Sequence, residues 1–284
     1  MSKIPTIALA GLIFILLFSG CAGRKEEKGI TVFCGSASKP PMEEIGAQFE
    51  KETGIRVYFN FSGSGTMLSQ MKIAKRGDLY VPGSPDYMVI AERDGVIDPQ
   101  TVKIVAYLVP AIAVQKGNPK NIRSLSDLTK PGLKVGIGNP ETVCVGLYAI
   151  ELLEYNHLLA DVGKNVVTYA ASCDATATLV ALKSVDAVMG WEVFARWQPA
   201  AIDAVFVKPE QIPRLAYIPA AISTFSADRN SAQRFLDFLI SAPAREILKK
   251  WGYATTEAEA RQYAPNAKIG GVYQLPASYQ PLAK

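Results

Sequence analysis

Short β-branched runs alternate with amphipathic stretches from residue 30 onward, and this alternation limits the chain to few folds. The run at 30–33 precedes Pro41, which suits a first helical turn, and then an apolar stripe with spacings of three and four. Further strands are expected at 55–61 and 78–81, each followed by a helical stretch. A β-α-β-α-β order predicts a parallel sheet with helices on both faces.

A second series of strands and helices begins near residue 134, after a long apolar stretch. Two long extended runs, 104–114 and 215–224, join the two series, so we expect two lobes with a double crossover. The first lobe would comprise 29–108 plus 222–284, and the second 109–221. The elements expected after residue 134 are strands at 134–137, 166–169, 187–189 and 205–207 and helices at 145–155, 174–183, 192–197, 231–240 and 244–251.

The first twenty residues have the pattern of an export signal. The apolar run at 7–18 is too short to span a bilayer, which needs about 20 residues. Small residues then precede Cys21, as in the lipobox of bacterial or archaeal lipoproteins. We therefore expect 1–20 to be removed, Cys21 to be lipidated, 21–28 to form a tether, and the mature protein to be anchored outside the cytoplasm. A plain signal peptide cut near Ala22 is the alternative.

Composition excludes several classes of function. The chain carries 30 basic and 26 acidic residues, a net charge of +4, without the basic stripe of a nucleic-acid-binding protein. His157 is the single histidine of the sequence, which excludes His-rich metal sites and weakens any Ser-His-Asp proposal. With 49% hydrophobic and 20% charged residues, the chain has an ordinary globular balance.

The expected strands end in loops rich in serine and glycine. Ligands of open α/β sheets bind beyond the carboxyl ends of the strands, where the first lobe has the loops 34–38 and 62–66. In the second lobe the corresponding loops are 138–146, 170–175 and 190–192. Such loops supply hydroxyls and lead into helix N-termini, which favour anions. Helix capping could explain either serine loop alone, but two on adjacent strands favour an anion site.

These loops and several other segments resemble the molybdate/tungstate-binding solute receptors of ABC importers. The resemblance covers most of residues 29–254 and implies a two-lobed periplasmic-binding-protein clamshell. Each lobe would be a mixed, mainly parallel sheet flanked by helices, with the anion between the lobes. The segments that carry it are 30–33, 35–38, 48–54, 61–66, 77–80, 138–143, 146–149 and 244–253.

The resemblance also implies which residues contact the anion. Where many members place a ligand-contacting tyrosine, this chain has Gly190, with Trp191 beside it. Hydroxyls would come from serines of the first lobe, and backbone N–H groups from the second. The ligand-binding residues that the resemblance implies are Ser36, Ser38, Ser64, Val145 and Ala175, and we add Trp191, which lies beside the missing tyrosine, as a candidate of this chain.

Three cysteines also fall in the expected cleft loops: Cys34, Cys144 and Cys173. Thiolates select soft metals, so the same clamshell could bind Cu(I), Zn(II) or a heavier thiophilic ion through them. Buried free thiols, or a disulfide between two of the three, would account for the same residues without a metal. No Cys-x-x-Cys pair supports the metal hypothesis.

An exported serine acyl-enzyme is a remote alternative, because residues 36–39 fit a Ser-x-x-Lys pattern. Lys39 precedes Pro40, which disfavours the helical turn that such chemistry needs. We therefore expect a binding protein without catalytic residues or cofactor. It would capture a small oxyanion, act as a monomer, and deliver its ligand to an ABC permease.

Overall fold

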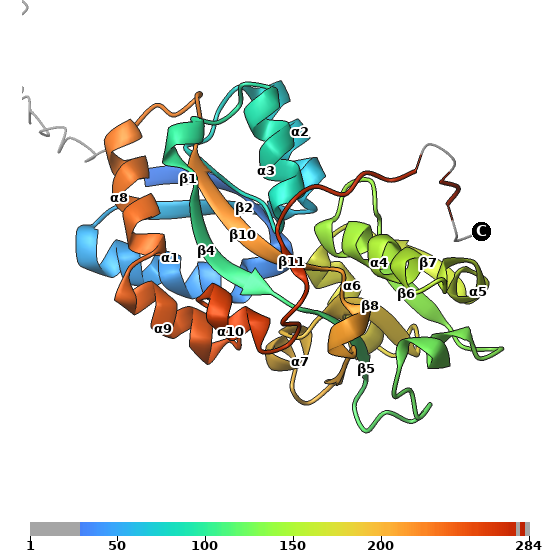
Figure 1. Cartoon of the computed structure of the whole chain (residues 1–284). Helices are drawn as coiled ribbons and strands as arrows, with labels where there is room; N and C mark the ends of the chain where they lie inside the picture. The colour runs from blue at the N-terminus through green and yellow to red at the C-terminus, as the bar shows by residue number, and fades with distance from the viewer. Residues whose placement is uncertain (1–28, 277–278, 282–284) are drawn as a thin grey trace, which may run out of the picture.

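The computed structural model describes residues 29–276 and 279–281 of the 284-residue chain. It consists of two helix-flanked sheets that lie side by side, one per lobe (Figure 1). The predictions for residues 1–20, the tether 21–28 and Cys21 fall outside the described residues. In the part of the chain that is described, no helix is both long and apolar enough to cross a membrane.

The first sheet has the strand order β11-β10-β3-β1-β2, with β4 paired to β10. β1 is parallel to β2 and β3, whereas β10 is antiparallel to β3 and β4, so the sheet is mixed. Its strands are β1 (Gly29–Gly35), β2 (Arg56–Ser62), β3 (Leu79–Val81), β4 (Lys103–Leu108), β10 (Arg214–Ile222) and β11 (Lys268–Ile269). Its helices are α1 (Lys39–Thr53), α2 (Ser64–Ala74), α3 (Pro85–Arg93), α8 (Arg229–Leu239), α9 (Ala242–Lys250) and α10 (Glu257–Arg261).

Helix α1 shows how the sequence pattern becomes structure. Its apolar stripe, Met42, Ile45 and Phe49, is buried against the sheet, as the spacing predicts. The helix stops at Gly54, whose φ of 69° suits glycine and whose N–H donates to the Glu50 carbonyl at 2.8 Å. The chain is thereby turned directly into β2.

The second sheet has the order β7-β6-β8-β5-β9. β6 is parallel to β7 and β8, and β5 runs antiparallel to β8 and β9. Its strands are β5 (Pro110–Gln115), β6 (Val135–Gly138), β7 (Val166–Ala170), β8 (Ala187–Trp191) and β9 (Ile202–Phe206). Its helices are α4 (Cys144–Tyr155), α5 (Leu159–Gly163), α6 (Cys173–Ala181) and α7 (Phe194–Trp197). Single 3-10 turns are η1 (Ser36–Ser38), η2 (Pro99–Thr101), η3 (Leu125–Thr129) and η4 (Pro209–Gln211).

The chain crosses between the sheets at two points. The long run at 104–114 divides at Val109, which separates β4 of the first sheet from β5 of the second. The return crossing lies at 207–213, since all of β10 pairs within the first sheet. The lobe boundaries expected from the sequence stay a prediction.

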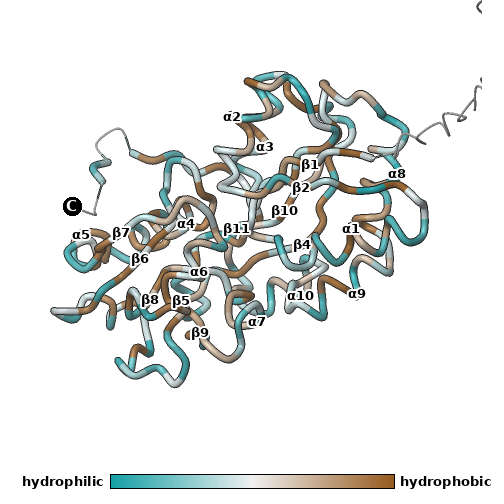
Figure 2. Tube along the Cα trace, turned by 180° about the vertical axis from the view of Figure 1, so that it is seen from behind, coloured by the Kyte–Doolittle hydropathy of each residue, from teal (hydrophilic) through white to brown (hydrophobic). Residues whose placement is uncertain are grey.

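A C-terminal tail makes a third link between the lobes (Figure 1, dark red). It leaves β11 and runs over the second lobe, where the hydroxyls of Tyr279 and Tyr169 lie 2.8 Å apart. Figure 2 shows brown, hydrophobic stretches along the strands of both sheets and teal stretches on the outer turns. One cluster of buried apolar residues includes side chains from both lobes, so the described conformation is closed.

Candidate functional site

The strand-end loops of the two lobes meet face to face. The N–H of Gly65, in α2, donates to the carbonyl of Thr142 of the second lobe at 2.9 Å. The N–H of Asp174, in α6, donates to the Ser36 hydroxyl at 3.2 Å. Lys39 reaches the Asp174 carboxylate at 3.6 Å. The loops that the sequence placed on opposite sides of one cleft are therefore in contact.

Ser36 and Ser64 are the first-lobe hydroxyls at this contact, and each is 1% exposed. The oxygen of Ser36 accepts the Asp174 N–H, and that of Ser64 accepts the Gly83 N–H at 3.0 Å. A hydroxyl has one proton and two lone pairs, so Ser64 keeps its proton for donation. The Ser36 hydroxyl is also hydrogen-bonded to the Asp174 carboxylate: burial raises the pKa of that carboxyl, but the hydroxyls of Ser172 and Ser36 more than offset this and the pKa is lowered. Ser38 is also fully buried, but its hydroxyl lies 3.6 Å from the Cys34 sulfur.

Val145 and Ala175 lie in the first turns of α4 and α6, as the strand-end rule requires. The Ala175 N–H donates to the Ser172 hydroxyl at 3.2 Å, which caps α6, so a ligand at this amide would compete with the cap. Burial raises the pKa of Cys173 well above its usual value, and the Val145 amide and the Trp191 indole partly oppose this rise. Both N–H groups therefore point toward the same sulfur.

Trp191 is fully buried at the end of β8. Its Nε1–H makes no hydrogen bond of ordinary geometry within the described chain. Its ring packs edge-on against Tyr148, with the centroids 5.2 Å apart. An indole N–H is a donor only, and in this conformation it faces the Cys173 sulfur, a weak acceptor that a ligand oxygen could replace.

The three cysteines are free and buried. The sulfurs of Cys144 and Cys173 lie 3.5 Å apart, and burial raises the pKa of Cys34 to about 12. Cys144 reaches across to the first lobe, where a Cβ on Gly83 would lie 2.5 Å from its sulfur.

This arrangement does not support the soft-metal alternative. Within the described residues, no group of three His, Cys, Asp or Glu side chains could hold a metal ion. Burial also raises the pKa of Cys34 and Cys173, so a metal would have to displace protons that are held more tightly than in an exposed thiol. Cys34 also contacts the Gly35 carbonyl, at 3.4 Å. Of the three hypotheses for the cysteines, the described conformation agrees with buried free thiols.

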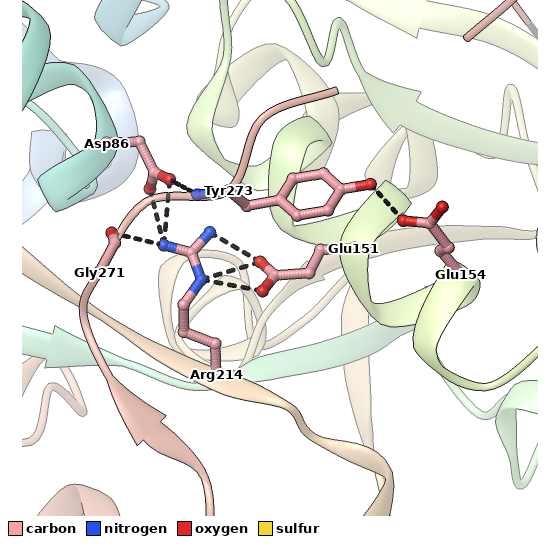
Figure 3. A network of polar contacts seen from close by, with 6 residues as sticks. All are labelled: Asp86, Glu151, Glu154, Arg214, Gly271 and Tyr273. Carbon is pink, nitrogen blue, oxygen red and sulfur yellow. Dashed lines mark hydrogen bonds and ion pairs between the residues drawn. The ribbon is translucent and has the colours of Figure 1, made fainter. Parts of the chain in front are cut away.

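Sequence reasoning missed a buried charge network beside the cleft (Figure 3). The Arg214 guanidinium, on β10, lies between Asp86 of α3 at 3.0 Å and Glu151 of α4 at 2.6 Å. It also donates to the Gly271 carbonyl of the tail at 2.8 Å and covers the Tyr148 ring at 4.0 Å. The network therefore ties together both lobes and the tail. The only sequence signal is an arginine that begins an apolar run.

Glu192 directly follows Trp191 at the end of β8. Its carboxylate accepts the Val109 N–H at 2.7 Å, at the crossing from β4 to β5. Burial raises the pKa of this carboxyl to about 8. It therefore braces the crossing segment. A pocket of about 200 Å³ opens at the rim of the cleft, lined in part by Gly65, Tyr87 and Thr142.

Comparisons with known proteins agree with this geometry. The family pattern described as "Bacterial extracellular solute-binding protein" matches residues 30–254. The molybdate-binding protein ModA of Escherichia coli is 25% identical over 235 residues, which cover 80% of this chain and 90% of ModA. A binding protein of Haemophilus influenzae is 29% identical over 141 residues, and there the match spans only 57% of the relative's length.

A solved structure confirms the fold. The sulfate-binding protein SubI of Mycobacterium tuberculosis superposes with a TM-score of 0.73 at 18% identity, covering 86% of this chain and 94% of SubI. At this identity the likeness concerns the fold alone. The predicted two-lobed clamshell is thereby confirmed.

Proposed function

The chain belongs to the family of bacterial extracellular solute-binding proteins, and we propose that it captures a small tetrahedral oxyanion between its lobes for an ABC importer. The anion would be of the molybdate, tungstate or sulfate kind. Support for this class comes from the ligand named for ModA, which is similar in sequence over most of this chain. The role is binding, and we propose no reaction at the site.

The observation that carries this proposal is the pair of buried serines at the interlobe contact. Ser36 and Ser64 each accept a backbone N–H. The Ser64 proton is left for donation, whereas that of Ser36 would have to turn from the Asp174 carboxylate to the ion. The Val145 amide and the Trp191 indole, which both lie beside the Cys173 sulfur, would be the donors from the second lobe. A fully deprotonated oxyanion offers acceptors only and matches such a set. Hydrogen phosphate carries a proton that needs an acceptor, so it would fit less well.

Capture would use the two crossings as a hinge. With the lobes apart, the strand-end loops are open to water, and closure around the ion replaces its hydration shell by hydroxyl and amide donors. Two peptide segments, at Val109 and at 207–213, would bend. The closed form would then dock on the permease.

Ligand-dependent stability tests the assignment. A ligand that binds only the folded state stabilises it by about 2.7 kcal/mol at a hundred times its Kd. Thermal unfolding would be followed with molybdate, tungstate, sulfate, phosphate, Cu(I) and Zn(II). We expect stabilisation by one or more of the first three, weakened in Ser36→Ala and Ser64→Ala. A metal effect abolished by Cys144→Ser and Cys173→Ser would instead overturn the oxyanion assignment.

Ser223→Ala is the matched control. Ser223 is 1% exposed, like the site serines, and its hydroxyl accepts the Phe225 N–H at 3.0 Å. Its own N–H donates to the Asp78 carbonyl, just before β3 begins, so it lies at the edge of the sheet opposite the cleft. Its loss should lower stability without changing ligand affinity.

We further propose that Cys21 carries a lipid after removal of residues 1–20, which anchors the protein to the outer face of the cell membrane. The support is the apolar run followed by small residues and cysteine. In cells, Cys21→Ser should move the protein from the membrane fraction to the soluble fraction. Retention of that variant in the membrane would contradict the proposal.

A further inference from the structure

Ser84 is a fully buried serine in the loop between β3 and α3. It is 0% exposed and stands at the N-cap of α3, where serine side chains usually accept a helix N–H. Its side chain makes no capping bond, and within the described residues its hydroxyl has no hydrogen-bond partner. Because folded proteins pair almost all buried polar atoms, a lone hydroxyl of this kind calls for a partner from outside the chain.

The position of Ser84 in the fold matches those of Ser36 and Ser64. The strands β3, β1 and β2 are neighbours and run parallel. Ser84, Ser36 and Ser64 each follow the end of one of these strands, in that order. The carboxyl ends of parallel strands share one edge of a sheet, so each of the three loops brings one buried serine to the same edge.

Direct contacts place the Ser84 loop at the interlobe site. The N–H of Gly83, its neighbour, donates to the Ser64 hydroxyl at 3.0 Å. A Cβ on Gly83 would lie 2.5 Å from the Cys144 sulfur of the second lobe and 2.7 Å from the Ala37 Cβ. The lack of a side chain at position 83 therefore lets the second lobe approach this loop closely.

We propose that Ser84 is a third hydroxyl donor to the bound oxyanion, a role that rests on the proposed function of the site. Ser36 and Ser64 each spend a lone pair on a backbone N–H, whereas the Ser84 hydroxyl is committed to nothing in the described chain. The ligand is thus its first partner. A tetrahedral ion offers four oxygens, and the third serine lets the first lobe hold more of them.

The substitution Ser84→Ala separates this role from a structural one. Loss of a hydrogen bond to a charged ligand should weaken affinity by about tenfold to a hundredfold, as measured by calorimetry with the anion that best stabilises the natural chain. Stability without ligand should stay the same or rise, because the hydroxyl that is removed has no partner. Ser84→Cys, which keeps the size but offers a weak donor, should also lose affinity.

Ser223→Ala should show the opposite pattern, with lower stability and unchanged affinity. Unchanged affinity in Ser84→Ala would overturn the inference and leave the proposed function standing. An equal loss of affinity in Ser84→Ala and Ser223→Ala would also overturn it, because the loss would then come from a disturbed fold and not from a missing contact with the ligand. If no oxyanion stabilises the natural chain, the proposed function fails and the inference fails with it.

Discussion

Replacing Arg214 by methionine should destabilise the protein by about 3–5 kcal/mol, the cost of removing one partner from a buried ion pair. The side chains of Arg214 and Asp86 are each 3% exposed, and that of Glu151 is 15% exposed. Methionine fills similar space but leaves both carboxylates without their cation. The tail loses a contact as well, since the Gly271 carbonyl accepts from Arg214.

Urea denaturation without ligand measures this loss of stability. Since each kcal/mol lowers the thermal unfolding midpoint by about 2–4 °C, the midpoint of Arg214→Met should fall by about 6–20 °C. The matched control is Arg229→Met, because Arg229 is 55% exposed and pairs with Asp98 at the surface. Exposed pairs contribute about 0–1 kcal/mol, so this variant should remain close to the natural chain. Adding Asp86→Asn and Glu151→Gln to Arg214→Met should recover part of the stability, because no unpaired charge then remains.

The stability lost in Arg214→Met should also depend on pH. Burial raises the pKa of Glu151 despite its bonds to Arg214, and without that cation the pKa rises further. A carboxyl with a raised pKa in the folded state retains a proton that the unfolded chain has lost, so stability falls as pH rises. Arg214→Met should therefore be less damaging near about pH 5 than near about pH 8. A loss no larger than that of Arg229→Met, or one independent of pH, would refute the reasoning.

Three further predictions concern other parts of the structure. Burial raises the pKa of Glu192 from 4.5 to about 8, so its folded form keeps a proton that the unfolded form has lost. The stability of the natural chain should therefore fall as the pH rises from 4.5 to about 8, by up to about 1.4 kcal/mol per pH unit. In Glu192→Gln, the midpoint of urea unfolding should fall less over the same pH range. Gly83→Ala should weaken ligand binding and increase the radius of gyration measured by X-ray scattering, because the new methyl group would collide with the Cys144 sulfur and keep the lobes apart. An unchanged affinity and radius would show that the loops can shift to make room. In a Cys21→Ser background, Ellman's reagent should label the three buried thiols only in guanidinium, and rapid labelling of the native protein would contradict their burial.

Local pattern predicted most of the elements but less of their pairing. Apolar spacing and Gly54 defined α1, because both act within a few residues. The run at 215–224 was recognised as extended, yet its membership of the first sheet depends on partners such as Leu79 and Leu108. Those contacts join residues more than a hundred positions apart, and no local signal encodes them.

The site was predictable to the extent that it follows from topology. Strand ends must gather at one edge, so the loops of Ser36 and Ser64 were found from strand order alone. The Arg214 network was missed because its partners lie 128 and 63 positions away, on helices of different lobes. The absence of hydrogen-bonding partners around Ser84 within the described chain is likewise a property of packing.

The C-terminal tail changes what opening involves. It starts from β11 of the first sheet, yet Tyr279 rests on Tyr169 of the second. Rotation of the lobes away from each other must either stretch this clasp or detach it, and the Arg214–Gly271 bond lies on the same path. A fluorescent label placed beside Tyr279 would consequently report each release event as a change in local mobility.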